Sequence, residues 1–288
     1  MGVKFFGQFL VARGAVAPAE LLKAVELQRS TNLKFGEMAQ AMGLLSEADI
    51  QRVHNAQRGE DLPFGQMAVR LGLLTSAQME QVLTRQENSY LFIGRALVEI
   101  GALDEGELES HLQAFQADQA PYLVEAVELP PEVPLPEVWE VFADLTYKML
   151  TRVASLPHRK GGCQIVDRLP ANHAIATMDL SGAVSARYLF SASPGVQAAI
   201  ARTMLREDEV ETGPQELLDD ALMEFVNIIC GNAVAKAAQL GYRIEIAPPQ
   251  IQHPDADGLA VPAGDLGMLF PIHIVSDEQV AMAVFLQG

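Results

Sequence analysis

The sequence contains little cysteine and no uninterrupted hydrophobic segment long enough to cross a membrane. It has 288 residues, of which only 2 are cysteine. Both, Cys163 and Cys230, have apolar neighbours, and so few cysteines argue against a fold stabilised by disulfides. A membrane-spanning helix needs about 20 predominantly apolar residues, and polar residues interrupt every hydrophobic segment here. The first residues also lack the apolar region of a secretion signal. We therefore expect a cytoplasmic protein without a membrane segment.

Basic residues are also scarce. Lys and Arg number 20 against 37 Asp and Glu, and the formal net charge is −17. Proteins that bind nucleic acid usually carry a basic patch, and anionic membranes repel an acidic surface, so we expect neither as a partner. The 6 histidines and 2 cysteines show none of the short spacings that are typical of metal ligands. We expect no metal and no cofactor of the protein's own.

Glycines recur with a period of 29 residues through the first 115 residues. The two series are Gly7, Gly36, Gly65 and Gly94, and Gly14, Gly43, Gly72 and Gly101. Each copy predicts a short helix ended by its second glycine, then a longer helix that begins with a capping pattern such as Thr75 with Gln78. A single helix pair cannot bury its own apolar face. We therefore predict an all-α domain of four stacked repeats over residues 1–118.

These repeats resemble the N-terminal domain of type II secretion and MshE-type ATPases in their glycines, their apolar positions and their terminal glutamine. Some members of that family bind cyclic di-GMP through tandem motifs that begin Arg-Leu-Gly. The position of that arginine holds Phe5, Lys34, Pro63 and Phe92 here. Only Lys34 is positively charged, and lysine lacks the planar fork of arginine. The resemblance leaves cyclic di-GMP as a possible but disfavoured ligand, with Lys34 the one candidate contact, and favours a packing or partner-docking role.

A segment rich in proline and glutamate, residues 119–136, separates the repeats from the rest of the chain. Its closely spaced prolines favour extended backbone, which is typical of a linker. Beyond it, the pattern predicts helices at 137–156, 195–205 and 216–240, and strands at 163–168, 174–180, 184–190, 243–247, 268–275 and 280–286. Ser181 and Gly182 are expected to form a hairpin turn. Residues 137–288 should form a two-layer α/β domain with a mostly antiparallel sheet, which makes the whole chain α+β.

The helix predicted at 216–240 carries the most informative polar residues. Asp220, Glu224 and Asn227 follow at i, i+4 and i+7, so they share one stripe of the helix, and Gly231 continues it. The opposite face, which should be core, carries Leu218, Leu222, Phe225 and Ile229. Such a stripe can simply be the solvent face of a core helix. However, asparagine and glycine both disfavour a helix interior, which suggests a face kept for contact with another molecule.

The spacing Asp220-x3-Glu224-x2-Asn227, followed by Pro249, resembles the signature of the CheC, CheX and FliY family of chemotaxis phosphatases. The similarity extends over residues 136–288. Members of this family remove the phosphoryl group from the phospho-aspartate of CheY-type response regulators. The resemblance therefore implies a response-regulator phosphatase with an N-terminal regulatory or docking domain.

The same resemblance implies a role for each residue of the site. Asn227 would orient the attacking water, and Glu224 would pair with a lysine of the regulator. Asp220, Gly231 and Pro249 would support or shape the site. The Mg²⁺ of the reaction would be held by the regulator rather than by this protein.

The helix predicted at 137–156 contains no Glu-x2-Asn, so the domain has one such site. A single site is similar to the CheX branch of the family, which is typically dimeric, and the resemblance thus implies a homodimer. A second interpretation stays open from the residues alone. The chain could be a non-catalytic signalling adaptor that binds a response regulator or cyclic di-GMP.

Overall fold

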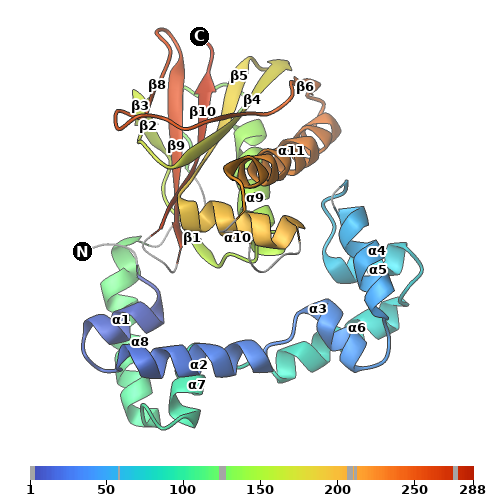
Figure 1. Ribbon diagram of the computed structural model, residues 1–288, viewed down its shortest axis with the longest axis vertical. Helices are drawn as coiled ribbons and strands as arrows, with labels where there is room; N and C mark the ends of the chain where they lie inside the picture. The colour runs from blue at the N-terminus through green and yellow to red at the C-terminus, as the bar shows by residue number, and fades with distance from the viewer. Residues whose placement is uncertain (1–3, 58, 123–127, 206–209, 211–212, 275–277) are drawn as a thin grey trace. The chain divides into compact units, whose positions relative to one another are not determined.

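Two units make up the chain, Met1–Leu123 and Val124–Gly288 (Figure 1). The computed structural model describes residues 4–57, 59–122, 128–205, 210, 213–274 and 278–288. The division falls within the linker predicted at residues 119–136, of which residues 123–127 lie outside the described ones. Further along that segment, Leu129, Val133 and Leu135 pack against the core of the second unit. The later part of the predicted linker therefore contributes to the second unit.

In the first unit, each repeat forms a short helix and then a longer one. The short helices are α1 (Phe6–Ala12), α3 (Phe35–Ala41), α5 (Phe64–Arg70) and α7 (Ile93–Glu99). The longer helices are α2 (Pro18–Thr31), α4 (Glu47–Gln57), α6 (Ser76–Asn88) and α8 (Glu105–Gln119), and the 3₁₀ helix η1 (Ala120–Tyr122) follows α8. Gly43 follows the end of α3 with a φ of 70°. A side chain is rarely compatible with this left-handed conformation, so the second glycine of the repeat ends the short helix.

The glutamine that ends the first three repeats connects one repeat to another. Its Nε2 donates to a backbone carbonyl in three places: Gln28 to Leu91 at 3.1 Å, Gln57 to Leu62 at 2.7 Å, and Gln86 to Leu33 at 2.9 Å. Each carbonyl comes directly before the N-cap residue of a short helix. The first repeat is thereby tied to the fourth, and the second to the third. Two separate apolar clusters follow the same pairing.

The second unit is built on an antiparallel sheet with the strand order β1-β9-β10-β5-β4-β6, in which β2 also pairs with β9 and β7 with β4. Its strands are β1 (His158–Lys160), β2 (Gln164–Val166), β4 (Ala174–Gly182), β5 (Ala186–Ala192), β6 (Ile244–Ile246), β7 (Gln250–Gln252), β9 (Leu266–Ile274) and β10 (Gln279–Leu286). A separate antiparallel pair is formed by β3 (Arg168–Leu169) and β8 (Leu259–Ala260).

Helices α9 (Pro136–Arg152), α10 (Pro194–Leu205) and α11 (Gln215–Gln239) pack on one face of the sheet (Figure 1). Their apolar residues meet alternate residues of the central strands, and Trp139, Phe142, Tyr188 and Phe225 are fully buried there. The other face of the sheet forms a smaller cluster with residues of β3 and β8. The predicted fold class is confirmed: a helical region is followed by an α/β domain with an antiparallel sheet.

The hairpin between β4 and β5 differs from the prediction. Strand β4 continues through Ser181 and Gly182, and the turn comes at residues 183–185. The reason is that the end of β4 pairs on its other side with β6, where Gly182 lies opposite Ile244. A Cβ at position 182 would lie 2.6 Å from the carbonyl oxygen of Arg243. The glycine therefore serves this close approach between strands and also the positive φ of 104° at the last residue of β4, directly before the turn.

Three further boundaries differ from the sequence pattern. The strand expected at 163–168 is divided into β2 and β3, which belong to different sheets. The helix expected to reach 156 ends at Arg152, and Ser155, with a φ of 53°, leads the chain towards β1. The strands β1, β7 and β8 were not predicted, whereas helix α11 runs through Gly231 as the helix predicted at 216–240 does. Strands of two or three residues are too short to show a periodic pattern.

Candidate functional site

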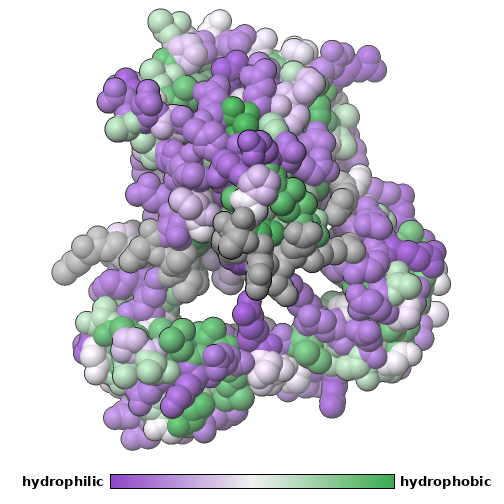
Figure 2. Space-filling view, in the orientation of Figure 1, coloured by the Kyte–Doolittle hydropathy of each residue, from purple (hydrophilic) through white to green (hydrophobic). Residues whose placement is uncertain are grey.

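Helix α11 places the predicted polar stripe on the surface of the second unit. Its core face is confirmed, with Leu218, Leu222, Phe225 and Ile229 all buried. Asp220, Glu224 and Asn227 are exposed, and Gly231 is half-buried. Hydrophilic residues predominate on the face of this unit seen in Figure 2, with hydrophobic residues in smaller patches. The helix therefore combines a buried side that fixes its position and an exposed side that another molecule can reach.

The amide and the carboxylate at the centre of the stripe contact each other. Nδ2 of Asn227 donates a hydrogen bond to Oε2 of Glu224 at 3.2 Å. Among the residues that the structure describes, this is the one hydrogen bond that either side chain forms. It orients the Asn227 amide and leaves its carbonyl oxygen available to a water or a partner.

The two carboxylates of the stripe have no cation partner among the residues that the structure describes. Neither Asp220 nor Glu224 forms an ion pair with another described residue of the chain. By contrast, Asp144 on α9 lies 2.7 Å from Nζ of Lys148 and 3.7 Å from Nζ of Lys236 on α11. The acidic charge at Asp220 and Glu224 is therefore available to a basic group from another molecule.

The backbone at Gly231 is open. Apart from its two chain neighbours and the adjacent backbone of α11 itself, no atom of the described residues lies within 4 Å of the place that a Cβ at this position would occupy. Packing within the protein therefore does not require a glycine here. One turn beyond Asn227, the helix leaves space where a side chain or the backbone of a partner can approach closely.

Pro249 lies in the segment between β6 and β7, at the edge of the sheet. Strands β6 and β7 both pair with β4, and both contact α11. Between them, the N–H of Ala247 donates to the carbonyl of Asp179 at 3.0 Å. Pro248 and Pro249 have no N–H and cannot continue this ladder. The segment from β6 to β7, which carries Pro249, thus runs antiparallel to β4 on the side of the sheet edge where both strands contact α11.

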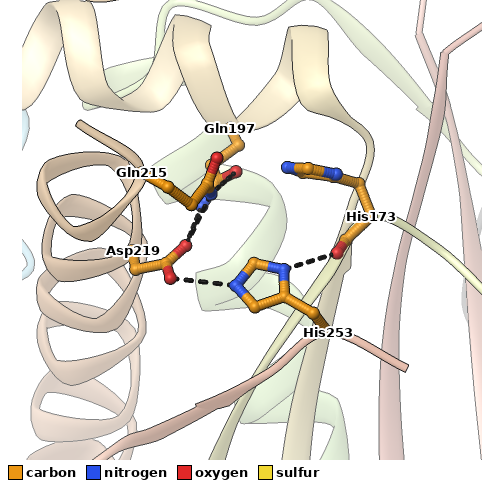
Figure 3. A network of polar contacts seen from close by, with 5 residues as sticks. All are labelled: His173, Gln197, Gln215, Asp219 and His253. Carbon is orange, nitrogen blue, oxygen red and sulfur yellow. Dashed lines mark hydrogen bonds and ion pairs between the residues drawn. The ribbon is translucent and has the colours of Figure 1, made fainter. Parts of the chain in front are cut away.

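A second polar cluster at the N-terminal end of α11 was not predicted (Figure 3). The carboxylate of Asp219 accepts hydrogen bonds from Gln197 and Gln215, both at 2.8 Å, and lies 2.9 Å from Nε2 of His253. Nδ1 of His253 lies 2.8 Å from the carbonyl oxygen of His173. These residues come from α10, α11, the end of β7 and the start of β4. Gln215 and Asp219 lie one turn apart on α11, but no local spacing relates them to Gln197, His173 or His253, so only the fold completes the cluster.

The charges of this cluster favour one another. Burial by itself would raise the pKa of Asp219, but hydrogen bonds from His253, Gln215 and Gln197 lower it below its usual range. The pKa of His253 is raised, mainly by its hydrogen bond to Asp219. The protein environment therefore stabilises a carboxylate at Asp219 and an imidazolium at His253.

The two cysteines are poor nucleophiles in this environment. Burial raises the pKa of Cys230 well above its usual value and that of Cys163 to about 11. Both thiols therefore stay protonated at neutral pH, although Cys230 lies on α11 three residues from Asn227. Among the polar groups described on this stripe, the exposed carboxylates and the amide are the ones that another molecule can reach.

Lys34 lies in the first unit, as the N-cap residue of α3, and its backbone N–H donates to Oε2 of Glu37 at 2.7 Å. The other residues at this position of the repeat, Phe5, Pro63 and Phe92, are also the N-cap residues of short helices. The position that would carry the arginine of a nucleotide-binding motif thus begins a helix in every repeat. That cyclic di-GMP is a disfavoured ligand, with Lys34 as the one candidate contact, stays a prediction.

By length and composition, α11 could cross a membrane, although the polar residues along the chain led us to expect no such segment. It is the one helix in the described part of the chain with this property, and 56% of its most apolar window is buried inside the unit. A core helix of a folded domain meets the same criterion. The burial of Phe225 and Ile229 within the α/β core shows where this apolar surface is used.

Residues 174–273 match the family model of the chemotaxis phosphatase CheX. This region contains the whole of α11 and Pro249, and the second unit is therefore CheX-like. Comparison with curated proteins found no match.

Several solved structures resemble the second unit. The chemotaxis protein CheX from Desulfovibrio desulfuricans is 18% identical, covers 52% of this chain and 99% of its own, and has a TM-score of 0.46. The CheX in a complex with CheY, BeF3 and Mg²⁺ from Borrelia burgdorferi is 16% identical, covers 52% and 98%, and has a TM-score of 0.44. Thermotoga maritima FliY is 16% identical, covers 55% and 91%, and has a TM-score of 0.42.

Proposed function

We propose that the second unit is a phosphatase that hydrolyses the phospho-aspartate of a CheY-type response regulator. The observation that carries this proposal is the exposed pair of Asn227 and Glu224, which lies within the region that matches CheX. In the reaction, a water oxygen attacks the phosphorus atom in line with the leaving group. The bond between phosphorus and the aspartate oxygen breaks, the carboxylate leaves, and inorganic phosphate is released.

An exposed amide on a rigid helix suits this reaction. Phosphoryl transfer needs an oriented water and neutralised charge more than it needs a covalent group from the protein. Asn227, oriented by Glu224, would enter the active site of the regulator and position the water. The regulator would supply Mg²⁺, so this chain needs no cofactor of its own.

The unpaired carboxylates suit a basic partner. Glu224 would pair with a lysine of the regulator, and Asp220 would add negative potential on the same stripe. Pro249, from the neighbouring segment, would shape the edge of the docking surface. Complementary charge of this kind mainly increases the rate of encounter and selects the correct partner.

The same proposal extends to the assembly and to the repeats. The second unit would form a homodimer, and residues 1–118 would act as a regulatory or docking domain. Cyclic di-GMP is a disfavoured ligand, since lysine replaces the motif arginine once and uncharged residues replace it elsewhere. Calorimetry with cyclic di-GMP should show no sub-micromolar binding, and light scattering of the full chain should give the mass of two copies.

The experiment that tests the catalytic function uses the full chain and a panel of phosphorylated CheY-type regulators. Loss of phosphate from each regulator is followed with and without the protein. We expect at least one regulator to lose its phosphoryl group much faster in the presence of the protein. If a regulator binds but its dephosphorylation is not accelerated, the chain is an adaptor and the catalytic proposal is wrong.

A further inference from the structure

The cluster around Asp219 holds the segment that carries Pro249. His253 comes directly after β7, which has only three residues, Gln250–Gln252. Before β7, Pro248 and Pro249 interrupt the hydrogen-bond ladder with β4. The backbone alone therefore attaches this segment weakly to the sheet. The side chain of His253 adds an anchor at its end, with contacts to α11 and to the residue before β4 (Figure 3).

The geometry fixes the protonation state in which this anchor is complete. Nδ1 of His253 faces the carbonyl oxygen of His173 at 2.8 Å, and Nε2 faces the carboxylate of Asp219 at 2.9 Å. The carbonyl oxygen of His173 can only accept a hydrogen bond. The carboxylate of Asp219 can likewise only accept one, because it is ionised. A neutral imidazole has one N–H and can donate to only one of them. Both bonds form together only when His253 is the imidazolium.

We propose that Asp219 and His253 are positioning residues, which hold the Pro249 segment against α11 when His253 is protonated and release it when His253 loses its proton. This inference rests on the proposed phosphatase function, because it assigns a role to Pro249 at the docking surface. In this role neither residue contacts the phosphoryl group. Their effect on the reaction passes through the position of the segment between β6 and β7.

The surroundings of His253 support this assignment. The titratable groups that face it are Asp219 from α11 and the ring of His173, which lies edge-on with centroids 5.5 Å apart. Helix α10 contributes Gln197, and α11 also contributes Gln215, both uncharged. Both donate to Asp219, and Gln215 also donates to the side-chain oxygen of Gln197. Two side-chain amides thus hold the carboxylate of Asp219 in place independently of its contact with His253. The raised pKa of His253 agrees with this arrangement.

The test compares the full-length protein with His253→Gln and Asp219→Asn. As a matched control, His111→Gln makes the same change in the first unit. Dephosphorylation of the cognate regulator is measured from neutral to mildly alkaline pH. We expect kcat/KM of the wild type to fall as His253 loses its proton, and both variants to show kcat/KM on the order of tenfold lower at neutral pH. Their profiles should lack the alkaline decline, whereas His111→Gln should follow the wild type.

Two measurements on the same proteins do not depend on activity. Histidine NMR should show that the resonance lost in His253→Gln titrates above the ordinary value in the wild type and at lower pH in Asp219→Asn. The protection of the amides at 250–252 against hydrogen exchange, relative to the intrinsic rate at each pH, should fall in the wild type as this proton is lost, and should be low at every pH in His253→Gln.

The outcomes separate this inference from the proposed function. A wild type that dephosphorylates no regulator overturns the phosphatase, while NMR and hydrogen exchange still decide whether the anchor exists. An active wild type whose kcat/KM and pH profile are unchanged by His253→Gln overturns the positioning role. Unchanged exchange at 250–252 in that variant overturns the anchor itself.

Discussion

Helices α9 and α11 pack on the same face of the sheet, but they use their acidic residues differently. On α9, Asp144 pairs with Lys148 and also with Lys236 of α11. On α11, Asp220 and Glu224 have no cation partner in the described part of the chain. The acid of α9 is thus neutralised within the unit, whereas those of α11 stay available to another molecule.

The contrast recurs within α11 between two adjacent residues. Asp219 accepts three hydrogen bonds and is mostly buried, with 14% of its side chain exposed. Asp220 is exposed and unpaired among the described residues. A rotation of about 100° along the helix separates a carboxylate that holds the fold from one that faces a partner. Neighbours in space, rather than residue type, decide the role of each acid.

The largest effect should come from removing the exposed amide. Asn227→Ala should lower kcat about 100-fold, because a preorganised polar group that acts in the transition state contributes on that scale. Binding of the phosphorylated regulator should change little. Gln239→Ala, which removes an exposed amide at the end of the same helix, is the control and should keep the wild-type rate. If Asn227→Ala turns over the regulator at the wild-type rate, the catalytic role of the amide is refuted.

A smaller effect is expected from the adjacent carboxylate. Glu224→Ala should raise KM by about threefold to tenfold, because it removes an unpaired charge from the docking surface. The effect should shrink as salt is added, since salt screens exposed charges. Steady-state kinetics at two salt concentrations measure both features. Glu140→Ala removes an exposed carboxylate from α9 and should leave KM unchanged, and an equal effect of the two variants would speak against a specific contact at Glu224.

The buried neighbour Asp219 should matter for stability. Asp219→Ala should lower the free energy of unfolding by about 1–2 kcal/mol at neutral pH, because three donors lose their acceptor. The pKa of His253 is raised, so its contribution is complete below its unfolded pKa and is lost as pH rises through its folded pKa. The pKa of Asp219 is lowered, so its contribution is complete above its unfolded pKa and is lost as pH falls through its folded pKa.

Urea unfolding at a series of pH values measures the difference in the free energy of unfolding between wild type and Asp219→Ala. The sequence has 1 tryptophan, Trp139, which is buried in the second unit and reports on that unit alone. The difference should be greatest between the two pKa values and should diminish at both extremes. A difference that stays constant from acidic to alkaline pH would mean that the ion pair does not stabilise the unit.

The smallest effect is expected at the paired acid of α9. Asp144→Ala should change the free energy of unfolding by at most about 1 kcal/mol, since partly exposed ion pairs contribute little. Phosphatase activity should stay at the wild-type level. The same urea titration and kinetic assay apply. A large loss of activity in Asp144→Ala would show that α9 also contacts the regulator, and the contrast between the helices would no longer hold.

The local pattern of the sequence was sufficient to predict the helices and the stripe on α11. Phe225 and Ile229 recur with the helical period and are buried, while Glu224 and Asn227 lie on the exposed side. The glycine repeat likewise predicted where each short helix ends, because the left-handed conformation after α3 depends on Gly43 itself. Features that depend on residues within a few positions of one another can be derived from the chain alone.

Only the tertiary structure decided which distant residues meet. Gly182 was assigned to a turn because the sequence does not show that β6 would pair with the end of β4. The role of the glutamine that ends the first three repeats is not evident from the sequence, because Gln28 contacts the carbonyl of Leu91 in a distant repeat. Asp219 and His253 are separated by most of α11 and two strands, and their contact depends on the path of the edge segment beside the helix. Such contacts follow from the packing of whole elements, whose positions are fixed by burial of the core and by strand pairing, and neither is encoded in a local spacing.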